Sequence, residues 1–306
     1  MKIIQSWQGL LPADRGASVA MGNFDGVHLG HRSVIESAAA QGRLGVLTFE
    51  PHPREYFAPD APPFRLMNSE ARANRLAKLG VERLYELPFG AEMAGFSPED
   101  FAREVLANGL GVTHVTVGSD FCFGKGRKGT VADLTELGRQ YGFGVTVAPL
   151  LRSGGKEISS TAIRNALSEG RPQDAAAMLG HLHRIEGEVI HGEKRGRELG
   201  FPTANMSVAG LHLPRLGVYA VKVDVLTGPQ AGSYGGAASL GVRPMFGENT
   251  PNLETFIFDF AGDLYGQHLS VALVDYLRPE MKFDGLPALM EQMHADCDRA
   301  RAILAA

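Results

Sequence analysis

The sequence has little cysteine, a single tryptophan and no strong excess of charge. Its 306 residues include two cysteines, Cys122 and Cys297, which lie far apart and in no metal-ligand spacing, and the formal net charge is −4. Scarce cysteine argues against a disulfide-rich secreted domain and favours a reduced, intracellular protein. The small net charge gives no overall attraction to nucleic acid or to an anionic membrane, so neither is an expected partner.

Long apolar runs are also missing. No stretch approaches the roughly 20 apolar residues that a membrane helix requires, and the opening residues, MKIIQSWQGLLPADRG, lack the pattern of a signal peptide. We therefore expect a cytoplasmic protein. A hydrophobic content of 44% over 306 residues is enough for two domains, each with its own core.

Short apolar runs alternate with helical patterns in the first half of the chain. Strands are expected at residues 17–24, 43–51, 82–89, 114–121 and 143–150. Helices are expected between them at residues 31–42, 69–80 and 97–109, the last with Ser97 as its N-cap. Strands separated by helices predict an α/β domain with a parallel sheet.

The pattern of apolar runs changes after about residue 185. Five apolar runs follow one another without helices between them, at residues 183–192, 217–226, 237–244, 253–260 and 268–277. They predict an antiparallel sheet or barrel. A closing helix is expected over residues 286–305, with Leu286, Leu289, Met290 and Met293 on one face. The expected domains are residues 1–182 and 183–306.

The stretch MGNFDGVHLGHRSVI places two histidines and two glycines where the first strand gives way to a helix. A helix N-terminus presents free N–H groups to an anion, and Gly26 and Gly30 leave room for phosphate oxygens. His28 and His31, three residues apart, would add donors aimed at the charge that develops during nucleotidyl transfer. A plain glycine-rich turn with two exposed histidines is the alternative.

Two later stretches also suit phosphates. In VGSDFCFGKGRKG, Asp120 precedes a loop rich in glycine and basic residues. In EISSTAIRNAL, Ser160 and Thr161 begin a helix and Arg164 follows one turn later, which is a hydroxyl and guanidinium grip on terminal phosphates. Simple N-capping by the serines is the alternative there.

GNFDGVHLGH, TFEPHP, DFCFGKGRKG and ISSTAIR, in this order, resemble the adenylyltransferase module of the bacterial bifunctional riboflavin kinase/FAD synthetases, a Rossmann-like nucleotidyltransferase fold. The resemblance implies that His28 and His31 stabilise the α-phosphate of ATP. It implies that Ser160, Thr161 and Arg164 hold the outer phosphates. Other residues that it assigns to substrate binding are Gly22, Asn23, Phe24, Gly30 and Asp120. Ala162 departs from the basic residue that many members carry and is given no role.

The second domain begins with a glycine-punctuated basic loop, GEVIHGEKRGRELGFPTANM. Its glycines, which let the backbone approach phosphates, are Gly192, Gly196 and Gly200. The hydroxyl of Thr203 and the amide oxygen of Asn205 are hard ligands suited to Mg²⁺. A flexible hairpin followed by a proline turn is the alternative.

Farther on, the alternation of LETFIFDF places Glu254, Phe256 and Phe258 on one face of a strand. A carboxylate beside two aromatic rings is a candidate general base next to a ring-shaped substrate, and a solvated edge-strand glutamate is the alternative.

GRELGFPTAN, LGVYAV, LGVRPMFG, LETFIFDF, DLYGQ and LRPEMKF resemble, in order, the riboflavin kinase module, a small β-barrel. The resemblance implies Glu254 as the base, Mg²⁺ at Thr203 and Asn205, and Arg278 with the closing helix over the flavin. Met245 and Phe256 depart from a common threonine and a common histidine of that family.

The two resemblances together imply an enzyme that converts riboflavin to FMN and FMN to FAD, with ATP and Mg²⁺ as co-substrate and cofactor. Two rivals remain: an adenylyltransferase whose barrel only senses flavin, and a flavin carrier without catalysis. No oligomeric state is predicted.

Overall fold

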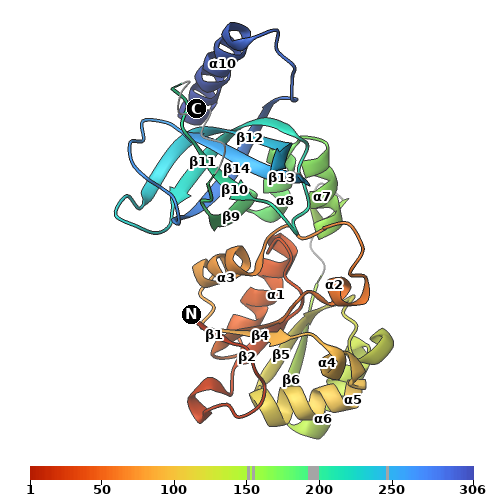
Figure 1. Cartoon of the computed structure of the whole chain (residues 1–306). Helices are drawn as coiled ribbons and strands as arrows, with labels where there is room; N and C mark the ends of the chain where they lie inside the picture. The colour runs from red at the N-terminus through yellow and green to blue at the C-terminus, as the bar shows by residue number, and fades with distance from the viewer. Residues whose placement is uncertain (150–151, 154–155, 192–199, 246–247) are drawn as a thin grey trace. The chain divides into compact units, whose positions relative to one another are not determined.

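The structure is a computed structural model that describes residues 1–149, 152–153, 156–191, 200–245 and 248–306 (Figure 1). The chain divides into two compact units. Unit 1 comprises Met1–Pro62 and Arg72–Ile158, and unit 2 comprises Pro63–Ala71 and Ser159–Ala306. Unit 2 thus begins before residue 183 and takes in a short segment from the first half of the chain.

Unit 1 is built on a parallel sheet of six strands. In sequence order they are β1 (Lys2–Ile4), β2 (Ser18–Met21), β3 (Leu44–Glu50), β4 (Arg83–Pro88), β5 (His114–Gly118) and β6 (Gly144–Ala148). Their order in the sheet is β1-β4-β3-β2-β5-β6, with every pair parallel. The five predicted strands and the parallel sheet are confirmed. The short edge strand β1 was not predicted.

Helices and turns connect these strands. They are η1 (Pro12–Asp14), α1 (Leu29–Ala39), α2 (Pro53–Phe57), α3 (Ser69–Lys78), α4 (Ala91–Gly95), α5 (Pro98–Asp100), η2 (Phe101–Leu110), η3 (Lys125–Arg127) and α6 (Val131–Tyr141). Ser97 caps α5 as predicted, because its hydroxyl accepts the Asp100 N–H at 3.0 Å. The helix then continues in the wider π form over η2, which the apolar spacing did not distinguish from an α-helix. A two-stranded piece, β7 (Arg152–Ser153) and β8 (Lys156–Glu157), lies outside the main sheet.

Unit 2 carries an antiparallel barrel of six strands. They are β9 (Arg184–Glu188), β10 (Thr203–Ser207), β11 (Gly217–Val225), β12 (Gly232–Met245), β13 (Glu248–Ile257) and β14 (His268–Arg278). Their order is β10-β13-β12-β11-β14-β9, and a single bridge from Ile190 to Asn205 joins the two ends of the sheet. The predicted barrel is confirmed. Residues Thr203–Ser207 form a strand there rather than a proline turn.

The closing helix α10 (Leu286–Ala305) has the predicted bounds, and its apolar contact lies on the second half of the predicted face. Leu286, expected on the apolar face, is 50% exposed. The contact with the barrel is made by Ala300 together with Cys297, Ile303 and Leu304. Cys297, Ala300 and Leu304 continue the stripe of Leu286 and Met293 at helical spacing, so the predicted face makes the contact, but farther along the helix.

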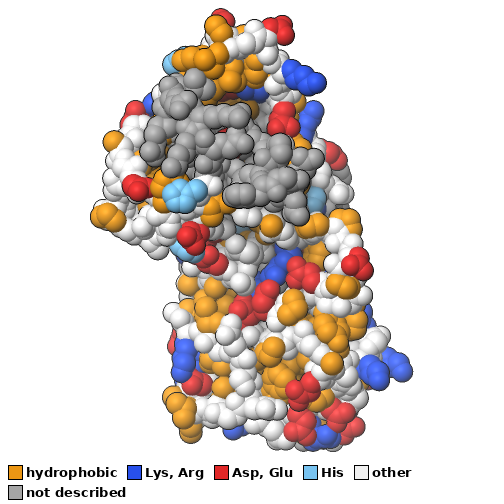
Figure 2. Space-filling view, viewed as in Figure 1, with side chains coloured by type: hydrophobic (Ala, Val, Ile, Leu, Met, Phe, Trp, Pro, Cys, Tyr) orange, Lys and Arg blue, Asp and Glu red, His pale blue; other side chains and the backbone are white. Residues whose placement is uncertain are grey.

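Two further helices of unit 2, α7 (Ser160–Ser168) and α8 (Pro172–Leu179), pack on each other around a small apolar cluster that includes Leu66. In the part of the chain that the structure describes, no helix is both long and apolar enough to cross a membrane. On the face shown in Figure 2, positively and negatively charged side chains are interspersed among the coloured residues. This pattern agrees with the small net charge of −4.

Candidate active sites

The first candidate site lies in unit 1, on the turn between β2 and α1. Three residues of this turn have left-handed backbone: Phe24 (φ 52°), Gly26 (φ 87°) and Val27 (φ 42°). Such backbone costs on the order of 1–3 kcal/mol at a non-glycine residue. Phe24 and Val27 are each only 1% exposed, so burial of their side chains holds the turn in this shape.

Two histidines stack at the start of α1. The ring centroids of His28 and His31 are 3.6 Å apart, with the planes inclined by 15°. The ring of Phe24, which is predicted to bind substrate, lies edge-on to that of His31 at a centroid distance of 5.2 Å. The i, i+3 spacing therefore brings the two predicted catalytic side chains together, and Phe24 supports one of them.

The hydrogen bonding of His28 fixes its tautomer. As N-cap of α1, His28 accepts the backbone N–H of His31 at its Nδ1, at 3.2 Å. Burial lowers the pKa of His28 from 6.5 to about 4, so the ring is neutral at pH 7. A neutral imidazole that accepts at Nδ1 carries its proton on Nε2. His28 therefore offers an N–H donor and no full charge.

The neighbouring ring is in a similar state. Burial, and the proximity of His28, hold the pKa of His31 well below its ordinary value of 6.5. Its Nδ1 is buried without a hydrogen-bond partner among the described residues. Gly30 leaves room beside this pair, because a Cβ there would come within 3.1 Å of the His28 ring, which would then have to shift slightly.

A buried ion network contacts the backbone of the same turn. Arg72 of α3 is 2% exposed and bonds Glu50 and Glu86 at 2.8 Å each. The backbone carbonyl of Asn23 accepts from Thr48 at 3.2 Å and from Arg72 at 3.5 Å. The Asn23 side chain, predicted to place substrate, is exposed. Sequence reasoning missed Arg72, because α3 carries several charged side chains and no motif sets this arginine apart.

The predicted basic loop follows β5. A pair of backbone bonds between Phe123 and Gly129, at 2.9 and 3.0 Å, pins its two ends. Between them Lys125, Arg127 and Lys128 are exposed and form no ion pair among the residues that the structure describes. Asp120, at the start of the loop, is also exposed. The loop therefore presents three cations on a closed frame, as a phosphate site requires.

The hydroxyl and guanidinium group lies at the start of α7, which belongs to unit 2. Ser159 caps this helix by accepting the Ala162 N–H at 3.3 Å, so the capping alternative is correct for that serine. Arg164 donates to the Thr161 hydroxyl at 3.4 Å and to the Phe64 carbonyl at 3.2 Å. Thr161 and Arg164 are thus brought together on one turn, with Ser160 beside them at the N-terminus.

An aromatic cluster near the end of the unit 1 sheet was not predicted. Phe57 is 66% exposed, and its ring lies 5.2 Å from that of Tyr56 and 5.7 Å from that of Phe89. Phe49 and Phe101 continue the cluster inward. The signal was present in REYF, directly after TFEPHP. Exposed rings on a supported cluster suit a flat ligand.

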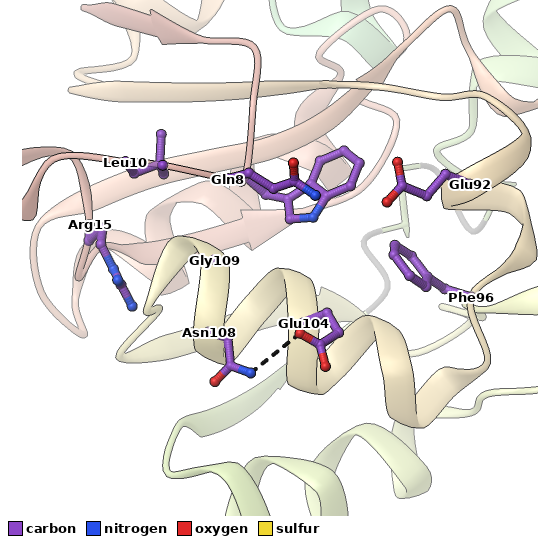
Figure 3. Close-up of a pocket in the computed structure, with 10 residues that line it drawn as sticks. Gln8, Leu10, Arg15, Glu92, Phe96, Glu104, Asn108 and Gly109 are labelled. Atoms are coloured by element: carbon purple, nitrogen blue, oxygen red, sulfur yellow. Dashed lines mark hydrogen bonds between the residues drawn. The ribbon is translucent and has the colours of Figure 1, made fainter.

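A pocket of about 440 Å³ lies elsewhere in unit 1, between the segment after β1 and helix η2. Figure 3 shows Glu92, Phe96 and Glu104 on one side of it and Arg15 on the other. Trp7 is packed against Gly109, where a Cβ would come within 2.5 Å of the Trp7 carbonyl. None of the predicted site residues lines this pocket.

The second candidate site lies on the outer face of the barrel. The register of β10 and β13 places Asn205 directly opposite Glu254, and Thr203 opposite Phe256. Directly opposed residues share a face of the sheet. This face also carries Phe258, whereas Leu253 and Ile257 point into the barrel core. The predicted alternation is confirmed, and the predicted metal ligands lie one strand from the predicted base.

Two buried amides connect these strands. Asn205 donates through Nδ2 to the Thr203 carbonyl at 3.3 Å, and its Oδ1 accepts from Nδ2 of Asn252 at 2.8 Å. Within the described ranges, no three side chains from His, Cys, Asp and Glu gather as a metal site. The predicted ligands Thr203 and Asn205 would offer a cation neutral oxygens.

Arg278 binds the closing helix α10 to the barrel. Its guanidinium makes a forked ion pair with Asp296 of α10, with the shortest distance 2.7 Å. Gln292 holds the same carboxylate at 2.9 Å. The predicted contact of Arg278 with flavin thus competes with a strong structural role. Gly200 lies in an exposed turn (φ 80°), while Gly192, Gly196 and the side chain of Met245 lie outside the described residues.

Comparison with known proteins decides the family. The family described as FAD synthetase matches residues 11–162, and the family described as riboflavin kinase matches residues 179–304. A bifunctional riboflavin kinase/FMN adenylyltransferase from Pseudomonas fluorescens is 39% identical and covers 100% of this chain and 98% of its own. The chain belongs to this bifunctional family. It is an enzyme with an FAD synthetase domain followed by a riboflavin kinase domain.

Two more similarities extend over both domains. A bifunctional riboflavin kinase/FMN adenylyltransferase from Escherichia coli K12 is 37% identical over 97% of this chain and 96% of its own. A crystal structure described as a macrolide-efflux protein from Streptococcus pneumoniae is 30% identical, covers 98% of each chain and has a TM-score of 0.81. The kinase and synthetase architecture therefore recurs as a whole.

Proposed function

We propose that this chain phosphorylates riboflavin to FMN in its barrel and then adenylylates FMN to FAD in its α/β domain, with ATP as donor in both steps. We assign residues 1–182 to the second activity and residues 183–306 to the first. The observation that carries the proposal is local: His28 stacks on His31 in unit 1, and Glu254 lies opposite Asn205 in unit 2. Membership of the bifunctional family supports it over the full length.

In FAD formation, a phosphate oxygen of FMN attacks the α-phosphorus of ATP as the bond to the β-phosphate oxygen breaks, and pyrophosphate leaves. Negative charge builds on the α-phosphate oxygens in this step. The Nε2–H of His28 is our candidate donor to that charge, since its Nδ1 is already engaged by the His31 N–H. A donor held in place before reaction stabilises the transition state without reorganisation.

Ser160, Thr161 and Arg164 are our candidates for the outer phosphates of the same ATP. The bond from Arg164 to the Thr161 hydroxyl, at 3.4 Å, and the one to the Phe64 carbonyl orient the guanidinium before substrate arrives. Planar guanidinium groups suit forked binding of phosphate oxygens. Asp120 and the adjoining basic loop are assigned to FMN.

The isoalloxazine ring of FMN is assigned to the aromatic cluster around Phe57. This ring is 66% exposed although it is large and apolar, and Tyr56 and Phe89 support it edge-on. A flat heteroaromatic ligand that stacks on Phe57 would cover surface that is costly to leave in water.

In FMN formation, Glu254 is our candidate base. It would accept the proton of the riboflavin 5'-hydroxyl as that oxygen attacks the γ-phosphorus of ATP, and ADP would leave. Its strand partner Asn205 and the nearby Thr203 offer neutral oxygens on the same face. Asn205 Oδ1 accepts one hydrogen bond and retains a second lone pair, so this donor set fits a hard cation.

Mg²⁺ bound by Thr203 and Asn205 would neutralise phosphate charge during transfer. These two side chains would also fix the orientation of the nucleotide against Glu254. Phe256 and Phe258 would exclude water from one side of the carboxylate, and α10, held by Arg278, would cover the flavin.

The test is a chromatographic time course of riboflavin with the pure protein, ATP and Mg²⁺. We expect FMN to appear first and FAD to follow. Conversion of added FMN to FAD without consumption of riboflavin would favour the rival in which the barrel only senses flavin. Tight flavin binding without release of ADP or pyrophosphate would favour a carrier. The cytoplasmic location stays a prediction.

A further inference from the structure

The carboxamide of Asn205 is oriented by a chain of hydrogen bonds whose direction is determined. A backbone carbonyl only accepts, so the Asn205 atom 3.3 Å from the Thr203 carbonyl is the Nδ2 donor. Its other atom, Oδ1, therefore faces Asn252, whose nearer atom at 2.8 Å is the donor Nδ2. Asn252 thus fixes which way the Asn205 oxygen points.

The second oxygen in this chain has no donor. Asn252 is 5% exposed, and its Oδ1 is buried without a hydrogen-bond partner among the described residues. A buried, unmatched acceptor is unfavourable for folding, and an apolar side chain of similar size would avoid the cost. The unmatched oxygen therefore offsets the stabilisation from the bond to Asn205, so the net contribution of Asn252 to stability is small.

The surroundings of the pair are rich in oxygen. Asn252 precedes Glu254 by two residues, so both lie on one face of β13, and Asn252 is opposite Gly241 of β12. The Glu280 carboxylate lies over Gly241, where a Cβ would collide with it. Two carboxylates and three amide or hydroxyl oxygens favour a cation over an anion at this face.

We propose that Asn252 is a positioning residue for the kinase site: its N–H holds Asn205 Oδ1 in the orientation that binds the magnesium-bound nucleotide. The inference rests on the proposed function of Thr203 and Asn205. Asn252 acts through Asn205 and is assigned no contact with the reacting atoms. Groups that hold a metal ligand from behind typically change metal affinity or activity 10- to 100-fold when they are replaced.

The test compares Asn252→Leu with a matched control, Thr255→Val. Thr255 is on the same strand, fully buried on the core face, and its hydroxyl also lacks a partner among the described residues. Calorimetric titration of the full-length protein with ADP and Mg²⁺, without riboflavin, reads binding independently of turnover. Thermal unfolding checks the fold of each variant.

We expect Asn252→Leu to weaken Mg²⁺-dependent ADP binding about tenfold and to raise the KM for ATP similarly, with kcat little changed. Thr255→Val should bind as the wild type does. Thr255→Val should unfold at the wild-type temperature or above. Asn252→Leu loses both an unmatched acceptor and the donor to Asn205, so it should unfold close to the wild-type temperature. A wild-type affinity in a folded Asn252→Leu protein would overturn the proposal.

A double-mutant cycle shows whether Asn252 acts through Asn205. In an Asn205→Ala background, Asn252→Leu should have no further effect on ADP binding, whereas a full tenfold additional loss would contradict the proposal. Failure of the proposed function is distinguishable: the wild type would then bind ADP and Mg²⁺ but leave riboflavin unchanged. Conversion of FMN to FAD should be the same in all variants and serves as the internal control.

Discussion

The two candidate sites are assembled in different ways. The site in unit 1 is local: His28 and His31 are three residues apart, and one turn of helix α1 stacks their rings. The site in unit 2 joins separate strands, since Asn205 and Asn252 are 47 residues apart. A motif with helical spacing therefore predicts contact directly, whereas a motif on a strand predicts only a face until the register is known.

The two sites also differ in what holds them. Next to the unit 1 turn, buried Arg72 forms an ion network with Glu50 and Glu86. Behind the unit 2 ligands lie two neutral amides. Loss of a partner destabilises the fold more for a buried charge than for a buried amide, because the unpaired charge has lost its hydration and has no counter-charge to replace it. Substitutions in the two supports should therefore have unequal effects.

The largest expected effect is on catalysis in the barrel. Glu254→Gln should lower the rate of FMN formation by about 10³-fold or more, because general base catalysis is lost while the shape is kept. FAD formation from added FMN should be unchanged. The measurement is the initial rate of each half-reaction, with the exposed Glu188→Gln on β9 as a matched control. Loss of both activities in a folded Glu254→Gln protein would contradict separate sites.

Replacement of Arg72 should have the next largest effect. Arg72→Met leaves the buried Glu86 without its cation and should destabilise unit 1 by about 3–5 kcal/mol. The exposed pair of Arg32 and Glu36 is the control, and Arg32→Met should cost less than about 0.5 kcal/mol. Urea unfolding of each variant gives the comparison. Equal losses in the two variants would show that the network is not what holds the turn.

Much of the fold could be predicted because its signals are local. Five strands of unit 1 and five of the barrel follow from apolar runs, and the bounds of α10 follow from periodicity. Periodicity predicts the packed face of α10 but not which of its turns meet the barrel, since Ala300 is buried and Leu286, on the same face, is exposed. That choice depends on the shape of the surface opposite.

The sequence predicts contacts within a motif better than contacts between distant segments, and this holds for both candidate sites. The pairing of His28 with His31 follows from spacing. The contact of Asn205 with Asn252 depends on strand register, and that of Arg72 with Glu86 depends on helix packing. Neither contact can be predicted from a single sequence motif. Within the motif, the spacing does not predict the left-handed φ of Phe24 or the edge-on contact of its ring with His31.

An intermediate effect is expected for the histidine pair. His28→Asn keeps a good N-cap for α1 but removes the Nε2–H donor, so FAD formation should fall about 10²-fold while FMN formation stays the same. The control is His114→Asn in β5 of the same unit, a histidine outside the site whose pKa is also lowered by burial. A normal rate of FAD formation in His28→Asn would remove His28 from the mechanism.

The smallest expected effect concerns pH and separates the two units. Burial lowers the pKa of His28 from 6.5 to about 4, so between these values the unfolded chain binds a proton that the folded chain does not. The free energy of unfolding must then decrease as the pH falls from 6.5 towards 4, and be unaffected above 6.5. Burial, with His181 and His212 nearby, lowers the pKa of His183 in unit 2 to about 3, so unit 2 loses stability in the same direction.

His28→Asn should remove on the order of 1–2 kcal/mol of the loss between pH 7 and 4.5, and His183→Asn should remove a separate part. Urea unfolding at the two pH values measures both, and the two reductions should add in the double variant because each histidine titrates within its own unit. Equal pH dependence in His28→Asn and the wild type would mean that His28 is not held neutral, and the donor assigned to the α-phosphate would lose its tautomeric basis.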